Sequence, residues 1–161
     1  MTIESVFLDT SFFIRLLNAG DPHHAVARRY LERFLKQQTK LYSSTIAVTE
    51  FGLKGNIEKL PNEYFVTLPY TARHAKVAID IGRVLLAARR KGVTLDGKRN
   101  VLLNDMKMLA QAHVIGCSHI IGRDGKFGST VDFLRSSEAA VTLQFVDIQQ
   151  VDTQAFFGEL F

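Results

Sequence analysis

Four acidic residues have the setting that a cluster of catalytic carboxylates requires. Asp9 directly follows the apolar segment 3–8 (IESVFL), and Asp124 comes just after a second apolar segment that ends in HIIG. The carboxyl ends of parallel strands meet at one edge of a sheet, and ligands bind in the crevice there. Glu50 and Asp105 are predicted to lie on helices. If these helices lean over the same edge, the four carboxylates would converge there.

Such a cluster predicts a divalent cation. Four carboxylates in a partly buried site would repel one another by several kcal/mol, roughly, so some would be protonated unless a cation lay between them. Oxygen ligands without His or Cys favour Mg²⁺ or Mn²⁺. A bound ion of this kind lowers the pKa of a water molecule and stabilises charge on a phosphoryl oxygen. The matching reaction is hydrolysis of a phosphodiester.

Each acid also has a purely structural explanation. Asp9 can cap the helix that follows it, and Glu50 can pair with Lys54 one turn later on a solvated helix face. Asp105 is predicted in the first turn of a helix that opens near residue 101, where the helix dipole favours an acid. Asp124 in RDGK can be a turn residue. Taken singly, these signals do not decide between structure and catalysis.

Strand and helix patterns alternate along the chain, which predicts a parallel sheet covered by helices on both faces. Thr10 or Ser11 is predicted to cap the first helix, and Asp21 with Pro22 the start of the second. A single domain is expected over residues 1–161, with a core at 1–148 and a short helical tail at 149–161. Predicted strands cover 3–8, 40–43, 64–68, the segment before Asp124, and 141–148; predicted helices cover 12–18, 23–38, 45–59, 72–90, a segment from about 101, 130–137 and 152–160.

The order of these signals resembles the PIN-domain ribonucleases, most closely the VapC-type toxins of toxin–antitoxin systems. The resemblance covers about residues 3–148 and rests on LDTSFFIRLL, SSTIAVTEF and NDMKMLAQAHVIGCSHIIGRDGKF. It implies a three-layer α/β/α sandwich with a mostly parallel central sheet, and an endoribonuclease that cleaves RNA with Mg²⁺ or Mn²⁺. The implied metal-binding and catalytic acids are Asp9, Glu50, Asp105 and Asp124. Ser11 and Asn104 are expected to support these acids.

The chain departs from the family pattern beside the last acid. Many members carry Thr or Ser two residues before it, where this chain has Gly122, and a further acid often follows closely, where this chain has Gly125, Lys126 and Phe127. These departures predict a weaker second metal site. They also leave open a catalytically silent PIN-like module that binds RNA or protein. A third possibility, aspartyl phosphotransfer through Asp9, lacks the second Asp typical of such phosphatases.

The overall charge suits a polyanionic partner. The chain carries 20 Lys and Arg against 16 Asp and Glu, a formal net charge of +4, and four of those acids are assigned to one site. Contacts to RNA phosphates are therefore expected from basic residues near the acids and around one loop. Solvated surface and stabilisation of helix C-termini are the alternatives. The candidate RNA-binding residues are Arg15, Arg89, Arg90, Lys98, Arg99, Lys107 and Arg123.

The remaining features concern partners and location. The start of the chain lacks the pattern of a signal peptide, and no apolar run is long enough to span a bilayer, so a cytoplasmic protein is expected. Cys117 is the only cysteine, which excludes an internal disulfide and favours a buried apolar role. The family resemblance implies a homodimer and an antitoxin that lies in a groove near the acids. The terminal FFGELF is the candidate contact surface.

Overall fold

A computed structural model describes residues 3–94, 99–137, 139 and 141–158, although not the side chains of residues 99–101. Its centre is one sheet of five parallel strands in the order β3-β2-β1-β4-β5. The mostly parallel sheet that the sequence predicts is thus entirely parallel within these residues. The strands are β1 (Ser5–Leu8), β2 (Lys40–Ser44), β3 (Val66–Leu68), β4 (His119–Gly122) and β5 (Gln144–Asp147).

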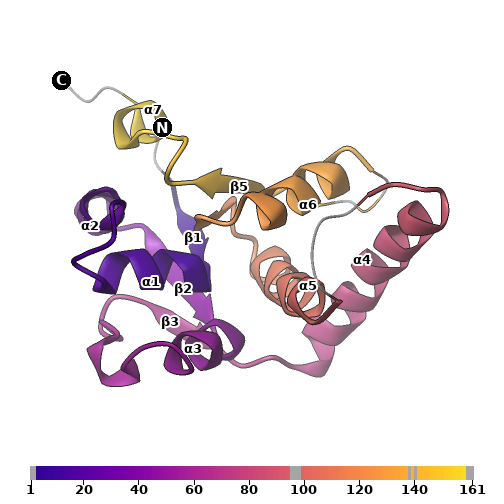
Figure 1. The fold of residues 1–161 in the computed structure, drawn as a ribbon, viewed down its shortest axis with the longest axis horizontal. Helices are drawn as coiled ribbons and strands as arrows, with labels where there is room; N and C mark the ends of the chain where they lie inside the picture. Colours follow the sequence, from indigo (N-terminus) through magenta and orange to yellow (C-terminus); the bar gives the residue numbers. More distant parts are fainter. Residues whose placement is uncertain (1–2, 95–98, 138, 140, 159–161) are drawn as a thin grey trace.

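Helices cover both faces of this sheet (Figure 1). One hydrophobic core, under α1 and α2, includes Phe12, Phe13 and Phe34. The other, under α4, α5 and α6, includes Leu85, Leu109 and Phe127. The chain is therefore a three-layer α/β/α sandwich, as expected. The helices are α1 (Thr10–Leu17), α2 (His24–Lys36), α3 (Thr45–Gly52), the 3₁₀ turn η1 (Ile57–Lys59), α4 (Ala72–Arg90), α5 (Arg99–Val114), α6 (Gly125–Arg135) and α7 (Thr153–Phe157).

The side chains of β1 alternate between the two hydrophobic cores. Val6 and Leu8 face the first core and Phe7 faces the second, because successive side chains of a strand point to opposite faces. Phe7 lies between Tyr42 of β2 and Ile120 of β4 in the sheet register. A buried central strand of this kind places the residue after it, Asp9, at the middle of the carboxyl edge of the sheet.

Several predicted element boundaries are wrong. The helix expected at 45–59 ends at Gly52, since Gly weakens a helix and Asn56 caps the separate turn η1 by accepting from the Glu58 N–H at 2.9 Å. The helix expected from residue 130 begins at Gly125. The helix expected from about residue 101 begins at Arg99. The second helix has His23 as its N-cap, and Asp21 accepts from the His23 N–H at 2.8 Å.

The terminal helix α7 packs on α2. Tyr30 contacts both Phe156 and Phe157 and donates a hydrogen bond to the Val151 carbonyl at 2.8 Å. Phe156 also lies edge-on to His119, the first residue of β4, with ring centroids 5.1 Å apart. Phe157 is thus buried within the chain and Phe156 is half-buried, whereas residues 159–161 of the same segment lie outside the described residues.

Two further sequence expectations concern single features. Cys117 is buried, and burial raises the pKa of its thiol to about 11, which suits the apolar role expected of it. In the described part of the chain, every helix is too short or too polar to cross a membrane.

Candidate active site

Asp9 lies between β1 and α1 and is almost fully buried, with 4% of its surface exposed. It is the N-cap of α1, so of the candidates that the sequence offered for this cap, Asp9 is correct and Thr10 and Ser11 are not. Its Oδ2 accepts hydrogen bonds from the backbone N–H of Ser11, at 3.1 Å, and from the Ser11 hydroxyl. Burial raises the pKa of Asp9 to about 6, against the lowering effect of the Ser11 hydrogen bonds and with a smaller upward contribution from the charge of Asp124. Asp9 therefore both caps α1 and lies close to other acids.

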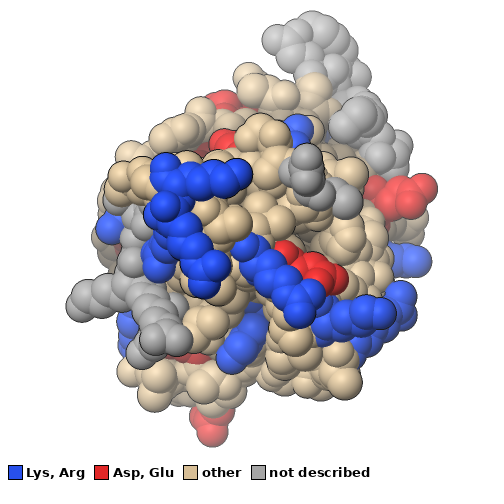
Figure 2. Space-filling model, turned by 90° about the vertical axis from the view of Figure 1, so that its right-hand side faces the viewer, with Lys and Arg blue, Asp and Glu red and all other residues tan. Residues whose placement is uncertain are grey.

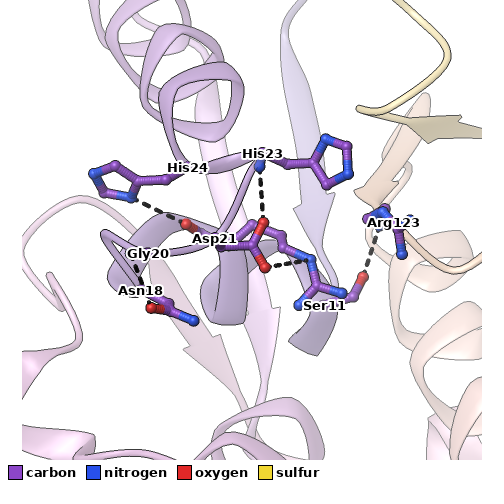
Figure 3. Close-up of polar contacts among 8 residues, drawn as sticks. Ser11, Asn18, Gly20, Asp21, His23, His24 and Arg123 are labelled. Atoms are coloured by element: carbon purple, nitrogen blue, oxygen red, sulfur yellow. Dashed lines mark hydrogen bonds and ion pairs between the residues drawn. The ribbon is translucent and has the colours of Figure 1, made fainter.

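The hydroxyl of Ser11 joins α1 to the end of β4. It accepts a 2.7 Å hydrogen bond from the backbone N–H of Arg123 while it donates to Asp9, and Figure 3 shows the bond to Arg123. A Cβ atom on Gly122 would lie 2.8 Å from this hydroxyl and 3.0 Å from Oδ2 of Asp9. The space next to Gly122 is thus filled by Ser11 and Asp9, which explains why no larger residue stands there.

Glu50 lies on α3 with both carboxylate oxygens engaged. The Thr10 hydroxyl donates to its Oε2 at 2.7 Å, and the Asn104 side-chain amide donates to its Oε1 at 2.7 Å. Glu50 therefore connects α1 with α5 across the carboxyl edge of the sheet. These contacts do not fit a solvated helix residue held by Lys54. Thr10 in this role is a residue that sequence reasoning missed, because it was considered only as a cap.

Asp105 lies in the second turn of α5 and not in the first, since α5 begins at Arg99. The helix-dipole explanation is therefore weak for this residue, because the dipole effect is confined to the terminal turn. Burial is the main cause, followed by the charges of Asp9, Asp124 and Glu50 in that order, and together they raise the pKa of Asp105 to about 8. The four acids thus share one electrostatic site, with Asp105 as the member most affected by the others.

Asp124 is the N-cap of α6 and not a simple turn residue. Its Oδ1 accepts from the backbone N–H groups of Lys126 and Phe127 at 3.0 and 3.2 Å. This cap explains why α6 begins five residues earlier than expected. It also holds the carboxylate at the carboxyl end of β4, beside the end of β1.

The donor set of this site fits a hard divalent cation in chemistry. The charges of the other three acids act on Asp105, and the pKa values of Asp105 and Asp9 are raised, an effect that a bound cation would reverse. Within the described residues, however, no three His, Cys, Asp or Glu side chains are close enough together to hold a metal ion as they stand. The carboxylates would have to approach one another to bind one. Asp9, Glu50, Asp105 and Asp124 are the residues able to do so.

The basic candidates differ in their surroundings. Arg15 forms an ion pair with Asp21, with Nε and Oδ2 3.2 Å apart, and Lys107 lies 5.7 Å over the ring of Tyr70. Arg123 is half-buried next to Ser11, and its Nε is buried without a hydrogen-bond partner among the described residues. Arg90 is exposed at the end of α4, whereas Arg89 is half-buried there. Lys98 lies outside the described residues, as does the side chain of Arg99.

Basic side chains nonetheless gather on one face of the molecule. Figure 2 shows Lys and Arg over the side that carries α4, α5 and α6 in Figure 1, with acidic side chains among them. A surface of this kind attracts a polyanion through long-range electrostatics.

The PIN domain family model matches residues 6–132. The chain therefore belongs to the PIN domain family. No curated protein sequence matches it. Solved structures that share its fold include VapBC2, VapC20 and VapBC-1.

These three structures share little sequence with the chain. VapBC2 from Rickettsia felis, bound to a DNA fragment from its promoter, is 12% identical with a TM-score of 0.57, covering 89% of this chain and 98% of its own. The VapC20 toxin of Mycobacterium tuberculosis, which cleaves the sarcin-ricin loop, is 19% identical with a TM-score of 0.53, covering 77% and 93%. VapBC-1 from nontypeable Haemophilus influenzae is 17% identical with a TM-score of 0.56, covering 90% and 98%.

Proposed function

We propose that the protein is a metal-dependent endoribonuclease that hydrolyses phosphodiester bonds of single-stranded or structured RNA. The observation that carries this proposal is the electrostatic coupling of Asp105 to Asp9, Asp124 and Glu50 at the carboxyl edge of the sheet. Membership of the PIN domain family and the shared fold with a toxin that cleaves the sarcin-ricin loop support it.

The chain's own residues would divide the work as follows. Asp9, Asp105 and Asp124, with Glu50, would hold Mg²⁺ or Mn²⁺. When bound, such an ion supplies a nucleophilic water and neutralises charge on the phosphoryl group. Ser11 orients Asp9, while Thr10 and Asn104 orient Glu50 through the hydrogen bonds described above. A carboxylate among the four that is free to accept a proton would then activate water for in-line attack.

The RNA itself would be held by charge. Arg123 lies beside Ser11 at the site, and Lys107, whose ammonium lies over the ring of Tyr70, is a further candidate on α5. Contacts from these side chains to phosphates would be independent of base identity and would weaken as salt is added.

We further propose that the protein is the toxin of a toxin–antitoxin pair, acts in the cytoplasm, and forms a homodimer. Two of the structures with this fold bear the names of VapBC complexes, which supports an antitoxin partner. Co-expression with a protein encoded next to it, followed by light scattering of the purified complex, tests both associations.

A second candidate is a catalytically silent module that binds RNA or protein. It is favoured by the finding that no three acids are yet at metal-binding spacing among the described residues. Such a module would tolerate loss of Asp105 without a change in function.

The decisive experiment compares cleavage of labelled RNA by wild type, Asp105→Asn and Asp132→Asn in Mn²⁺, Mg²⁺ or EDTA. Asp132 is an exposed acid on α6 paired with Arg135, so its substitution makes the same charge change away from the site. We expect cleavage that requires metal, falls by at least about 100-fold in Asp105→Asn, and is unchanged in Asp132→Asn. RNA binding without cleavage in any metal would favour the silent module instead.

A further inference from the structure

We propose that Gln111 is a positioning residue for the candidate active site, an inference that rests on the proposed function. Gln111 is fully buried on α5, two turns after Asn104. Its side-chain carbonyl accepts a 2.6 Å hydrogen bond from the Ser44 hydroxyl, and its side-chain amide donates to the Leu68 carbonyl at 3.0 Å. A buried amide engaged at both ends holds one orientation, because turning it would leave buried polar groups unpaired.

The two partners of Gln111 are the ends of neighbouring strands. Ser44 is the last residue of β2, Leu68 is the last residue of β3, and they pair with each other in the sheet register. Gln111 therefore ties α5 to the carboxyl edge of the sheet. This is the same edge at which Asp9 follows β1 and Asp124 follows β4.

Ser44 also determines where α3 begins. Its hydroxyl accepts a 2.9 Å hydrogen bond from the backbone N–H of Ile46 as the N-cap of α3, while it donates to Gln111. The helix that it starts carries Glu50. One hydroxyl thus links the origin of the Glu50 helix to the helix that bears Asp105.

A second connection joins the same two helices. Asn104, directly before Asp105, donates to Glu50 at 2.7 Å. The first connection joins the start of α3 to the later part of α5, and the second joins a later turn of α3 to an earlier turn of α5. The two helices are therefore held side by side and antiparallel. Together they determine where the carboxylate of Asp105 lies relative to that of Glu50.

Loss of the Gln111 connection would therefore act on catalysis through Asp105. A shift of about 1 Å in a reacting group can lower a rate by about 100-fold, and loss of a residue that orients metal ligands commonly lowers metal affinity by about 10- to 100-fold. Gln111 touches neither RNA nor metal in this scheme. Its effect should appear in kcat and in metal affinity, with little change in KM for RNA.

The test is Gln111→Met, which keeps the length of the side chain and removes both hydrogen bonds. Ser44→Gly is the second variant, because Gly is tolerated at an N-cap and the change removes the hydroxyl that Gln111 accepts from. Leu109→Ala is the matched control: Leu109 is a buried α5 residue in the hydrophobic core, so its truncation destabilises the fold without touching this connection. For each protein, kcat and KM are measured with RNA, the Mn²⁺ dissociation constant by electron paramagnetic resonance, and stability by urea unfolding.

We expect Gln111→Met and Ser44→Gly to lower kcat by about 10- to 100-fold and weaken Mn²⁺ binding by about 10-fold, with KM for RNA nearly unchanged. Leu109→Ala should keep kcat and Mn²⁺ affinity when it is folded, despite its lower stability. Losses that simply follow stability across all three variants, or wild-type kcat in Gln111→Met, would overturn the positioning role while leaving the nuclease intact. A wild type that neither binds Mn²⁺ nor cleaves RNA would overturn the proposed function, and the inference with it.

Discussion

Gly122 approaches Ser11 so closely that a Cβ atom at position 122 would lie 2.8 Å from the Ser11 hydroxyl oxygen. That hydroxyl is already engaged with Asp9 and with the backbone N–H of Arg123. Many family members carry Thr or Ser where this chain has Gly122. Here the space that a larger side chain would need is filled by Ser11 and Asp9. Ser11 lies at the start of α1, and its hydroxyl lies at the end of β4.

We predict that Gly122→Ala disturbs the site by displacing Ser11 from Asp9. Overpacking of this kind costs about 1–3 kcal/mol of stability, and we expect Mn²⁺ affinity to fall as well because Asp9 loses its orienting hydrogen bond. Urea unfolding and Mn²⁺ titration by calorimetry measure the two effects.

The control for that substitution is Gly125→Ala at the first position of α6. A Cβ atom there would meet no heavy atom within 4 Å, and we expect wild-type stability and Mn²⁺ affinity. If Gly122→Ala and Gly125→Ala behave alike, the close approach of Gly122 to Ser11 has no functional consequence.

We predict that the metal-free protein loses stability as the pH rises from about 4 to about 8. The pKa values of Asp105 and Asp9 are raised from 3.8 to about 8 and about 6 in the folded state. In this window the folded protein binds more protons than the unfolded chain, so the free energy of unfolding must fall as the pH increases. Urea unfolding in EDTA across this range measures the effect.

Asp105→Asn removes the group whose pKa is raised most, and so removes the larger part of the dependence of stability on pH. We expect it to raise the stability of the metal-free protein above pH 8 by roughly 1–3 kcal/mol, less than the full pKa shift implies because the side chain is half-exposed. Near pH 4 the two proteins should be equally stable. Adding Mn²⁺ should stabilise wild type at high pH and have little effect on the variant. A pH-independent difference between the two proteins would refute the electrostatic origin of the effect.

We predict that Phe157→Ala lowers stability without changing the active site. Phe157 is 2% exposed and packs on Tyr30 and Phe34 in the hydrophobic core under α1 and α2. Truncating a buried Phe costs about 3 kcal/mol. Thermal unfolding should report this loss, while the Mn²⁺ dissociation constant at a temperature where the variant is folded should match that of wild type.

Gln154→Ala provides the comparison on α7, because Gln154 is exposed and its substitution should be close to neutral. An altered Mn²⁺ affinity in folded Phe157→Ala would show that α7 influences the acids across the sheet.

The sequence carried enough local information to predict most of the architecture. The helix at 72–90 was predicted with its observed bounds, because an apolar stripe and the Gly92 terminator both lie within one segment. The strands before Asp9 and Asp124 were predicted from short apolar runs. The last strand, β5, was also predicted but is shorter than expected. The family resemblance implied that four separated acids share one site, which stays a prediction; in the structure the charges of the other three raise the pKa of Asp105.

Other features of the site depended on contacts between distant residues and were not predictable locally. Gln111 looked unremarkable apart from being the single amide within the apolar run MLAQAHV, and its partners lie on β2 and β3. Thr10 and Asn104 meet only at Glu50, which lies about forty residues from one and more than fifty from the other.

The sequence by itself determined the order of strands and helices, placed Asp9 and Asp124 after their strands, and placed Glu50 and Asp105 on helices. Periodicity, caps and glycines act within a few residues, which is why they can be interpreted along the chain. Only the tertiary structure decided that Asp105 lies a full turn inside α5, that Ser11 fills the space beside Gly122, and that Gln111 joins α5 to the strand ends. These relationships arise from close packing of segments far apart in sequence, where a fraction of an ångström decides which side chain fits.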